Sequence, residues 1–323
     1  MNILVTGGAG YIGSVCVEQL LDSGHKVVVF DSLVEGHRSA IDTRARFVLG
    51  DLSSRDAISA TLRDSNIEAV MHFAAHALVG ESMQNPTKYF RNNVSNGINL
   101  LDASVENRVR KVIFSSTCAT YGIPETLPVT EGTPQIPVNP YGESKLIMER
   151  ILKWYHQIHG MEFTALRYFN AAGASAHFGE HHRIETHLVP NLLFVALGNK
   201  AHAEIYGTDY ATPDGTCVRD YVHVADISRA HELALRSDVH GCFNLGTGIG
   251  FSVREVHRVC EEISGRKIHI IEKTRRSGDP ARLVATATLA NAKLGWIPQF
   301  TRLDKIVETA WNWHLRYPQG YSD

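Results

Sequence analysis

Short apolar runs alternate with longer amphipathic stretches through the first half of the chain. Runs rich in Val, Ile and Phe predict strands at residues 2–6, 26–31, 46–50, 69–73, 111–116 and 163–168. The stretches between them predict helices at residues 12–23, 55–64, 89–105 and 141–159. Strands that alternate with helices need crossover connections, which favour a parallel sheet covered on both faces. The expected fold class is therefore α/β, with a doubly wound parallel sheet.

The pattern becomes less regular after residue 173. A His-rich loop at 177–187 and a turn-rich stretch at 206–216 suit a smaller lobe that faces a substrate. Two later strand candidates, at 220–224 and 242–245, are expected to return to the main sheet. We therefore expect a first domain at 1–173 with returning segments near 220–247. A smaller C-terminal α/β substrate-binding lobe would occupy 174–323.

Composition and charge narrow the class of protein. The 323 residues are 44% hydrophobic and 20% charged, which is ordinary for a soluble globular protein with a large core. A formal charge of −2 gives no general reason to expect nucleic acid or an anionic membrane as partner. The first strand starts at Asn2 and leaves no room for a signal peptide, and no run approaches the roughly 20 apolar residues of a membrane helix.

The number and spacing of the cysteines indicate the redox state of the compartment. The five cysteines are odd in number, widely spaced and without CxxC pairs. This pattern favours a reducing compartment without structural disulfides or a zinc framework. We therefore expect a cytoplasmic protein. The cysteines are Cys16, Cys118, Cys217, Cys242 and Cys260.

Three glycines spaced three apart follow the first strand and open the first helix. Gly7, Gly10 and Gly13 permit a tight turn, close approach to a pyrophosphate and close packing of helix on strand. The helix N-terminus adds free N–H groups and a positive dipole. Asp31 closes the second strand, where its carboxylate can accept ribose hydroxyls and would repel a 2′-phosphate. The segment predicts a Rossmann-type domain that binds NAD rather than NADP.

Further cofactor-binding candidates follow the third and fourth strands. After the third strand an aspartate can lie near the adenine amine, although aspartate is also common in turns. After the fourth strand small residues allow the cofactor to lie against backbone. An amide on the next helix can lock the neighbouring loop or touch the cofactor. These candidates are Asp51, Leu52, Phe73, Ala74, Ala75, Asn92 and Asn93.

The mid-chain helix carries a tyrosine and a lysine four residues apart. Tyr141 and Lys145 share one helix face, where a nearby ammonium and an oxidised nicotinamide both favour a phenolate. The same lysine can bind the nicotinamide ribose. Thr117, at the carboxyl end of the fifth strand, is the expected substrate-facing hydroxyl, and Ser115 lies against nicotinamide or backbone. Alone, the Tyr–Lys pair is also compatible with a solvated helix start.

Taken in order, these motifs resemble the extended short-chain dehydrogenase/reductase family, and within it the UDP-sugar 4-epimerases. The likeness covers segments 6–13, 114–117, 121–122, 139–145, 167–170, 214–216, 218–224, 278–280 and 318–321. It implies reversible C4 epimerisation of UDP-glucose and UDP-galactose through a 4-keto sugar, with retained NAD and no net redox change. Tyr141 would take the proton of the 4-hydroxyl while Thr117 bonds the same oxygen. A homodimer through the helices at 92–105 and 141–159 is also implied.

The resemblance also assigns binding residues. Tyr11 and Ile12 join the glycines near the pyrophosphate, and Tyr168 lies beside the nicotinamide. The UDP half is implied to contact two arginines that face the diphosphate, since a guanidinium can engage two phosphate oxygens at once. The implied substrate-binding residues are Phe169, Asn170, Leu188, Arg219, Arg276, Asp279 and Leu283.

Three positions bear on substrate range, according to the resemblance. Some family members carry a lysine where this chain has His76 and Ala77. Leu283 is intermediate in size at a position linked to acceptance of N-acetylated sugars, so that acceptance stays open.

Competing functions differ in what they require. A 4,6-dehydratase needs an Asp-Glu pair after the catalytic threonine, and Cys118 and Ala119 stand there instead. Epimerases of UDP-pentoses or UDP-uronates remain alternatives. A non-catalytic NAD-binding regulator is disfavoured because the tyrosine, lysine and hydroxyl are all present.

The histidines and glutamates at 177–187 match neither a zinc-finger spacing nor HExxH. We expect no metal there, but a polar loop over the sugar.

Overall fold

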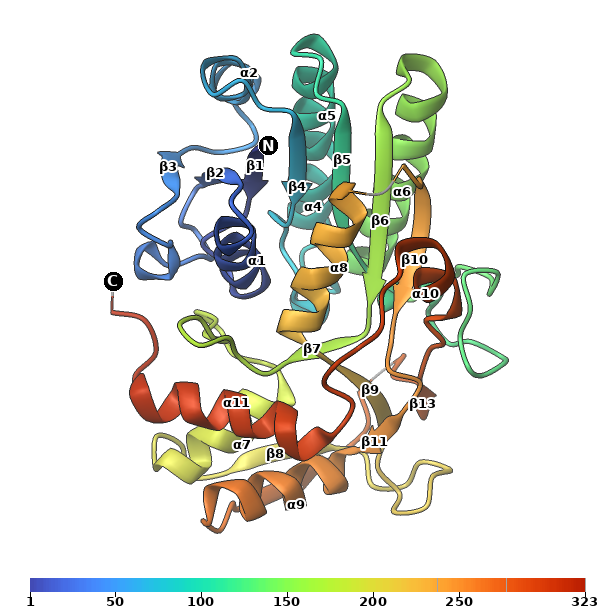
Figure 1. Ribbon diagram of the computed structural model, residues 1–323. Coiled ribbons are helices and arrows are strands. Elements are labelled where there is room, and N and C mark those ends of the chain that lie inside the picture. The colour runs from blue at the N-terminus through green and yellow to red at the C-terminus, as the bar shows by residue number, and fades with distance from the viewer. Residues whose placement is uncertain (237, 277, 323) are drawn as a thin grey trace.

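The computed structural model describes residues 1–236, 238–276 and 278–322. Within these residues seven parallel strands form one sheet, in the order β10-β6-β5-β4-β1-β2-β3 (Figure 1). The α/β fold predicted from the sequence is confirmed. The strands are β1 (Asn2–Thr6), β2 (Lys26–Asp31), β3 (Arg46–Leu49), β4 (Ala69–His72), β5 (Lys111–Thr117), β6 (Glu162–Tyr168) and β10 (Gly241–Leu245).

Helices cover both faces of this sheet. In β1, Ile3 and Val5 pack in one core with Cys16 of α1, whereas Leu4 packs in another with Ile58 of α2. Successive side chains of a strand point to opposite faces, so the continuous apolar runs reflect burial on both sides. On one face lie α1 (Tyr11–Asp22) and α8 (Val224–Arg236); on the other lie α2 (Arg55–Asp64), α5 (Asn96–Glu106) and α6 (Pro140–His159) (Figure 1).

A smaller α/β part lies beyond the carboxyl end of β6, which runs directly into β7 (Figure 1). One sheet has the order β11-β9-β13, with β7 also paired to β9, and a second pairs β12 with β8. Its strands are β7 (Asn170–Ala172), β8 (Ala203–Tyr206), β9 (Val218–His223), β11 (Gly250–Ser252), β12 (Ile270–Lys273) and β13 (Arg282–Leu283). Its core is formed with helices α7 (Leu188–Leu197), α9 (Val253–Ser264) and α11 (Leu303–Arg316).

One of the two predicted returning strands was wrong. The candidate at 242–245 is β10, which pairs with β6 at the edge of the main sheet. The candidate at 220–224 corresponds to β9, which belongs to the smaller sheet. In β9 the buried Asp220 carboxylate accepts N–H groups of Thr247 (2.9 Å), Gly248 (3.1 Å) and Ala285 (3.3 Å). These partners lie after β10 and β13, so contacts distant in sequence decide the sheet to which β9 belongs.

The predicted helix at 89–105 consists of several shorter elements. These are α4 (Pro86–Tyr89), a π-helical turn (Phe90–Ser95) and α5. The remaining short elements are α3 (Val79–Ser82), α10 (Thr288–Leu294) and 3-10 turns at Arg38–Ala40 and Cys118–Tyr121.

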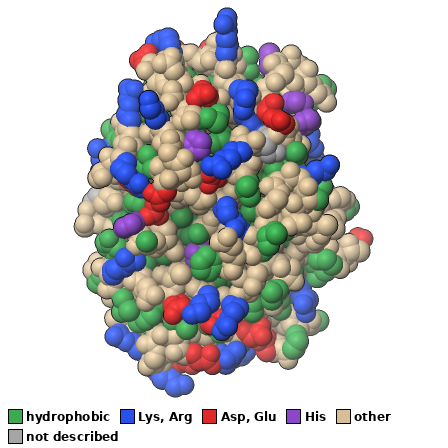
Figure 2. All heavy atoms as spheres, viewed as in Figure 1, with side chains coloured by type: hydrophobic (Ala, Val, Ile, Leu, Met, Phe, Trp, Pro, Cys, Tyr) green, Lys and Arg blue, Asp and Glu red, His purple; other side chains and the backbone are tan. Residues whose placement is uncertain are grey.

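The surface shows charges of both signs. On the face viewed in Figure 2, basic and acidic side chains are interspersed, in keeping with the formal charge of −2. None of the described helices combines the length and apolar character required to cross a bilayer.

Candidate active site

The glycine turn between β1 and α1 has the shape expected of a dinucleotide cradle. A Cβ on Gly7 would lie 2.5 Å from the Ala74 nitrogen, and one on Gly13 would lie 2.2 Å from the Gly7 carbonyl oxygen. A Cβ on Gly10 would meet only that oxygen, at 3.4 Å, so this position faces open space. No described side chain caps the first turn of α1. The turn therefore offers backbone N–H groups and room for a pyrophosphate.

Asp31 is held beside this turn. Its carboxylate accepts the N–H groups of Ala9 (3.0 Å) and Leu33 (2.8 Å). Burial raises the pKa of Asp31, and these two hydrogen bonds oppose the rise. A carboxylate has about four acceptor positions, so the oriented group can accept further hydroxyl donors. The glycines and Asp31 together fit the pyrophosphate and the ribose of NAD.

The other cofactor candidates differ in their surroundings. Asp51 is exposed and its side chain accepts the N–H of Ser53 (2.7 Å), as a turn aspartate does. The next residue, Leu52, is buried in the core beneath α2 and α5. Phe73 and Ala74 follow β4 and lie against the glycine turn. Ala75 comes next and is half-buried.

Asn93 connects the loop after β4 to the helix that carries Tyr141. Its buried amide accepts the N–H of His76 (2.9 Å) and donates to the His76 carbonyl (3.0 Å) and to Ser144 Oγ (3.0 Å). Asn92 instead donates to Asn93 Oδ1 (3.0 Å). The sequence left open which of the two amides locks the loop after β4. These hydrogen bonds assign that role to Asn93.

Thr117 and Tyr141 are brought together by the start of α6. The Asn139 side chain accepts the N–H of Gly142 (2.8 Å) and caps the helix. A Cβ on Gly142 would lie 2.5 Å from the Ala119 carbonyl oxygen, so α6 begins directly against the turn that follows Thr117. Thr117 Oγ1 also accepts the N–H of Ala119 (3.1 Å) and thereby caps that turn.

The pKa values of Tyr141 and Lys145 differ from the sequence expectation, which was a phenol pKa lowered by the nearby ammonium. Burial raises the pKa of Tyr141 to about 12, and the hydrogen bond with Thr117 opposes the rise. Burial lowers the pKa of Lys145 to about 7, against the effect of Glu149. The protein's own groups therefore leave the pKa of Tyr141 above its usual value. Formation of a phenolate therefore depends on the positive charge that an oxidised nicotinamide brings.

Lys145 is held against the end of β5. Its Nζ donates to the Ser115 carbonyl (2.8 Å) and lies 4.8 Å from the centre of the Phe114 ring. The Ser115 hydroxyl is hydrogen-bonded to the hydroxyl of Tyr168. The predicted residues at the ends of β5 and β6 thus form one connected group with α6.

A buried ion pair beneath this group was not predicted. Glu149 accepts hydrogen bonds from Ser116 Oγ (2.6 Å) and from Arg167 Nε (2.8 Å) and Nη2 (2.6 Å). Arg167 also donates to the Tyr121 hydroxyl (2.7 Å). This network fixes α6 on β5 and β6. The sequence signal was the spacing, because Glu149 follows Lys145 by one further helical turn.

The predicted substrate residues lie in two groups. Leu283 is paired in register with Arg219 and shares an apolar cluster with Tyr168 and Phe169 near the end of β6. Phe169 leads into Asn170, the first residue of β7.

The second group contains most of the charged candidates. Arg219 is ion-paired with Asp279, which also accepts the Tyr210 hydroxyl (3.4 Å). The Arg276 guanidinium lies 4.0 Å over the Tyr206 ring. Leu188 packs against the apolar cluster that contains Tyr210. Tyr206 and Tyr210 were not predicted as site residues. The only sequence signal for them was their position in the turn-rich stretch at 206–216.

The comparisons with known proteins agree with this geometry. The model of the NAD dependent epimerase/dehydratase family matches residues 3–246. A UDP-glucose 4-epimerase of Streptococcus mutans is 50% identical over 331 residues, covering 100% of this chain and 99% of its own.

Solved structures are similar over nearly the whole length. The UDP-glucose 4-epimerase of Brucella ovis in complex with NAD has a TM-score of 0.92 and 46% identity, covering 96% of this chain and 97% of its own. The enzyme of Bifidobacterium longum in complex with NAD+ and UDP has a TM-score of 0.95 and 36% identity, covering 99% and 100%. Because the family model matches most of the chain and a full-length relative is half identical to it, the chain belongs to the NAD dependent epimerase/dehydratase family.

Proposed function

We propose that the protein catalyses the reversible C4 epimerisation of UDP-glucose and UDP-galactose through a 4-keto sugar. The observation that carries this proposal is that the start of α6, which bears Tyr141 and Lys145, lies directly against the turn after Thr117, at the carboxyl end of β5 in a sheet whose glycine turn fits a dinucleotide. Two relatives of about the same length, both UDP-glucose 4-epimerases, support it. Bound NAD would supply a hydride acceptor and donor that is regenerated in each turnover.

Tyr141 moves the proton in this mechanism. Its phenolate oxygen accepts the proton of the sugar 4-hydroxyl and later returns it to the oxygen of the 4-keto sugar. Thr117 donates to the same oxygen and keeps it in line with the phenol. Lys145, buried and donating to the Ser115 carbonyl, would bind the nicotinamide ribose.

The remaining residues bind rather than react. NAD would be held by the glycine turn with Tyr11 and Ile12, by Asp31, and by the residues after β3, β4 and β5. The diphosphate of the substrate would be held by Arg219 and Arg276. Because Arg219 is paired with Asp279, a bound UDP would exchange this contact for its phosphate and offer its ribose to Asp279.

The sugar pocket would be less polar than the nucleotide site. Phe169 and Leu283 belong to one apolar cluster. Apolar walls make few directional contacts, so the 4-keto sugar can turn and present its other face. Leucine at 283 is intermediate in size, so activity on UDP-N-acetylhexosamines is a question for the assay below.

The proposal also assigns each ligand to a part of the chain and includes a homodimer. NAD belongs to residues 1–173 with β10, and the UDP-sugar belongs mainly to 174–323. A homodimer would form through α5 and α6, where Trp154 is 62% and Ile158 is 68% exposed. Both are apolar side chains that pairing of two chains would bury.

We place the protein in the cytoplasm, in keeping with five free cysteines among the described residues.

A coupled assay tests the proposal. Purified protein is given UDP-galactose without added NAD, and formation of UDP-glucose is followed, with UDP-N-acetylgalactosamine, UDP-xylose and UDP-glucuronate in parallel. Turnover of UDP-galactose without added cofactor is expected. Preferential turnover of the pentose or the uronate would favour another UDP-sugar 4-epimerase. Failure of every substrate after NAD is supplied would favour a non-catalytic NAD-binding regulator.

A further inference from the structure

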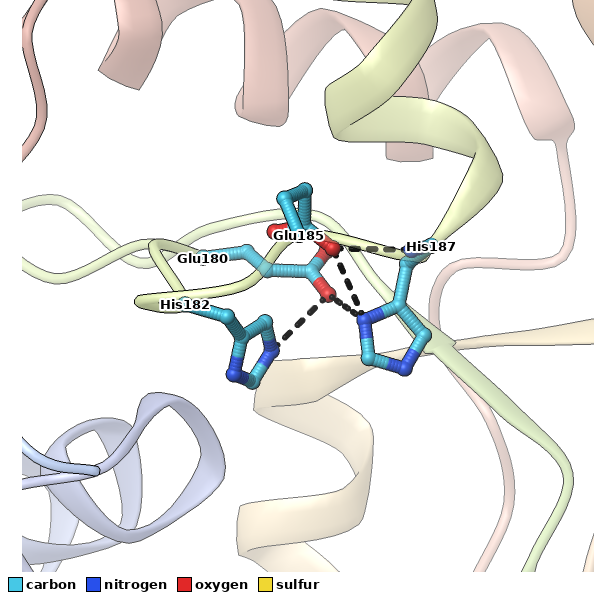
Figure 3. Close-up of side chains that lie close together, drawn as sticks. All are labelled: Glu180, His182, Glu185 and His187. Atoms are coloured by element: carbon cyan, nitrogen blue, oxygen red, sulfur yellow. Dashed lines mark hydrogen bonds and ion pairs between the residues drawn. The ribbon is translucent and has the colours of Figure 1, made fainter. Parts of the chain in front are cut away.

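Four metal-ligating side chains converge in the loop before α7. Glu180, His182, Glu185 and His187 point toward one another, each offering one ligand atom, and all four atoms lie within 4.8 Å of one another (Figure 3). His187 Nδ1 is 2.9 Å from Glu180 Oε1 and 3.1 Å from Glu185 Oε1. His182 Nε2 is 3.3 Å from Glu180 Oε1.

The surroundings concentrate negative charge. The side chains of Glu180 and Glu185 are 6% and 5% exposed, whereas those of His182 and His187 are 32% and 45% exposed. The two carboxylates are thus largely removed from solvent, and buried negative charge in a protein is paired with positive charge or bound to a metal ion.

Hydrogen bonding inside the cluster is incomplete. Among the described residues, two buried atoms of the cluster make no hydrogen bond, namely His182 Nε2 and Glu185 Oε2. A buried polar atom without a partner costs free energy, and a cation bound between the four side chains would give the His182 nitrogen a partner.

We propose that Glu180, His182, Glu185 and His187 bind one divalent cation of the zinc class. Two imidazole nitrogens and two carboxylate oxygens match the ligands of four-coordinate zinc, whose bonds of about 2.0–2.2 Å set ligand atoms roughly 3.3–3.5 Å apart. Three of the observed separations, 2.9 to 3.3 Å, would lengthen slightly on metal binding, and the other pairs, which lie within 4.8 Å, would shorten toward this spacing. Two neutral imidazoles and two carboxylates also balance the charge of the cation.

The cation is structural in this assignment. Four protein ligands close the coordination shell, which is the arrangement of structural rather than catalytic zinc. The His182 ring packs edge-on to Tyr11 of the glycine turn, with centroids 6.2 Å apart, and His187 immediately precedes Leu188, the first residue of α7. The site would therefore tie the start of α7 to the dinucleotide turn.

This inference departs from the expectation of no metal. The pattern Glu-x-His-x-x-Glu-x-His lies in a loop and matches none of the spacings considered from the sequence. The other histidines of the loop have different partners, since His177 pairs with Glu18 and His181 stacks on His37 (4.6 Å). The folded shape of the loop, and not the spacing along the sequence, therefore determines which side chains can act as ligands.

Metal titration of the full chain tests the proposal. Tag-free protein is treated with a chelator, dialysed and titrated with Zn²⁺ and, separately, with Co²⁺. We expect about one cation per chain, visible cobalt bands of tetrahedral intensity, and a higher unfolding temperature with Zn²⁺. His187→Gln and His182→Gln should each weaken binding by at least about 100-fold, because loss of outer-shell partners alone costs about 10- to 100-fold.

His177→Gln is the matched control, since this histidine lies in the same loop outside the cluster and should bind cobalt as the wild type does. Circular dichroism establishes that each variant is folded, and His182→Gln stands in if His187→Gln does not fold. Absence of stoichiometric uptake by the wild type would overturn the proposal and leave a buried ion-pair cluster. Equal cobalt binding by the wild type and both cluster variants would place the metal elsewhere.

Discussion

Substitution of Thr117 by valine isolates the hydroxyl from the packing. Valine has nearly the same shape, so the buried position stays filled, but two hydrogen bonds are lost. One bond is to Tyr141, where it opposes the rise of the phenol pKa. The other accepts the N–H of Ala119 at 3.1 Å and caps the following turn.

The two losses have separable magnitudes. A hydrogen bond to a charged partner contributes about 1.5–3 kcal/mol, and each 1.4 kcal/mol is about tenfold in rate, so kcat/KM should fall about 10- to 150-fold. Loss of the cap should lower the free energy of unfolding by about 1 kcal/mol. The phenol pKa, followed by ultraviolet absorbance of the NAD-loaded protein, should rise as well.

Thr117→Ser is the matched control, because serine keeps both hydrogen bonds and removes only a methyl group. Epimerase rates, denaturant unfolding and the pH profile are measured for both variants and the wild type. A valine variant within twofold of the wild-type rate would refute the role of the hydroxyl. If serine were as damaging as valine, the methyl contacts of Thr117 would explain the effect.

Three further predictions concern the proton acceptor, the cofactor and acid stability. Tyr141→Phe should retain fold and bound NAD but lose nearly all activity, and near-normal turnover would exclude Tyr141 as the base. Asp31→Ala should weaken the binding of NAD and reduce the preference for NAD over NADP in a binding titration. An unchanged preference would remove Asp31 from the ribose site. Burial lowers the pKa of one histidine to about 3 and of three others to about 4, so the unfolded chain binds more protons below pH about 6.5. Stability should therefore fall between pH about 6.5 and 4, by about 1.4 kcal/mol per pH unit for each histidine, and urea unfolding with a flat pH dependence would contradict this. These residues are His72, His223, His231 and His314.

Features encoded within one element were readable from the sequence. The glycines, Asp31 and the Tyr141–Lys145 pair each depend on spacing along a single strand, turn or helix. The six predicted main-sheet strands are confirmed as β1 to β6, and the helix predicted at 55–64 corresponds to α2. Local periodicity is set by backbone geometry, so these assignments need no knowledge of distant contacts.

Only the tertiary structure decided which distant residues meet. The pairing of Arg219 with Asp279, the ion pair of Glu149 with Arg167, and the placement of β9 outside the main sheet all join segments from different elements. The same holds for Tyr141, where burial raises the pKa of the phenol, whereas sequence reasoning expected the nearby lysine to lower it. Burial and long-range pairing are properties of the packed chain, and a linear pattern carries no direct record of them.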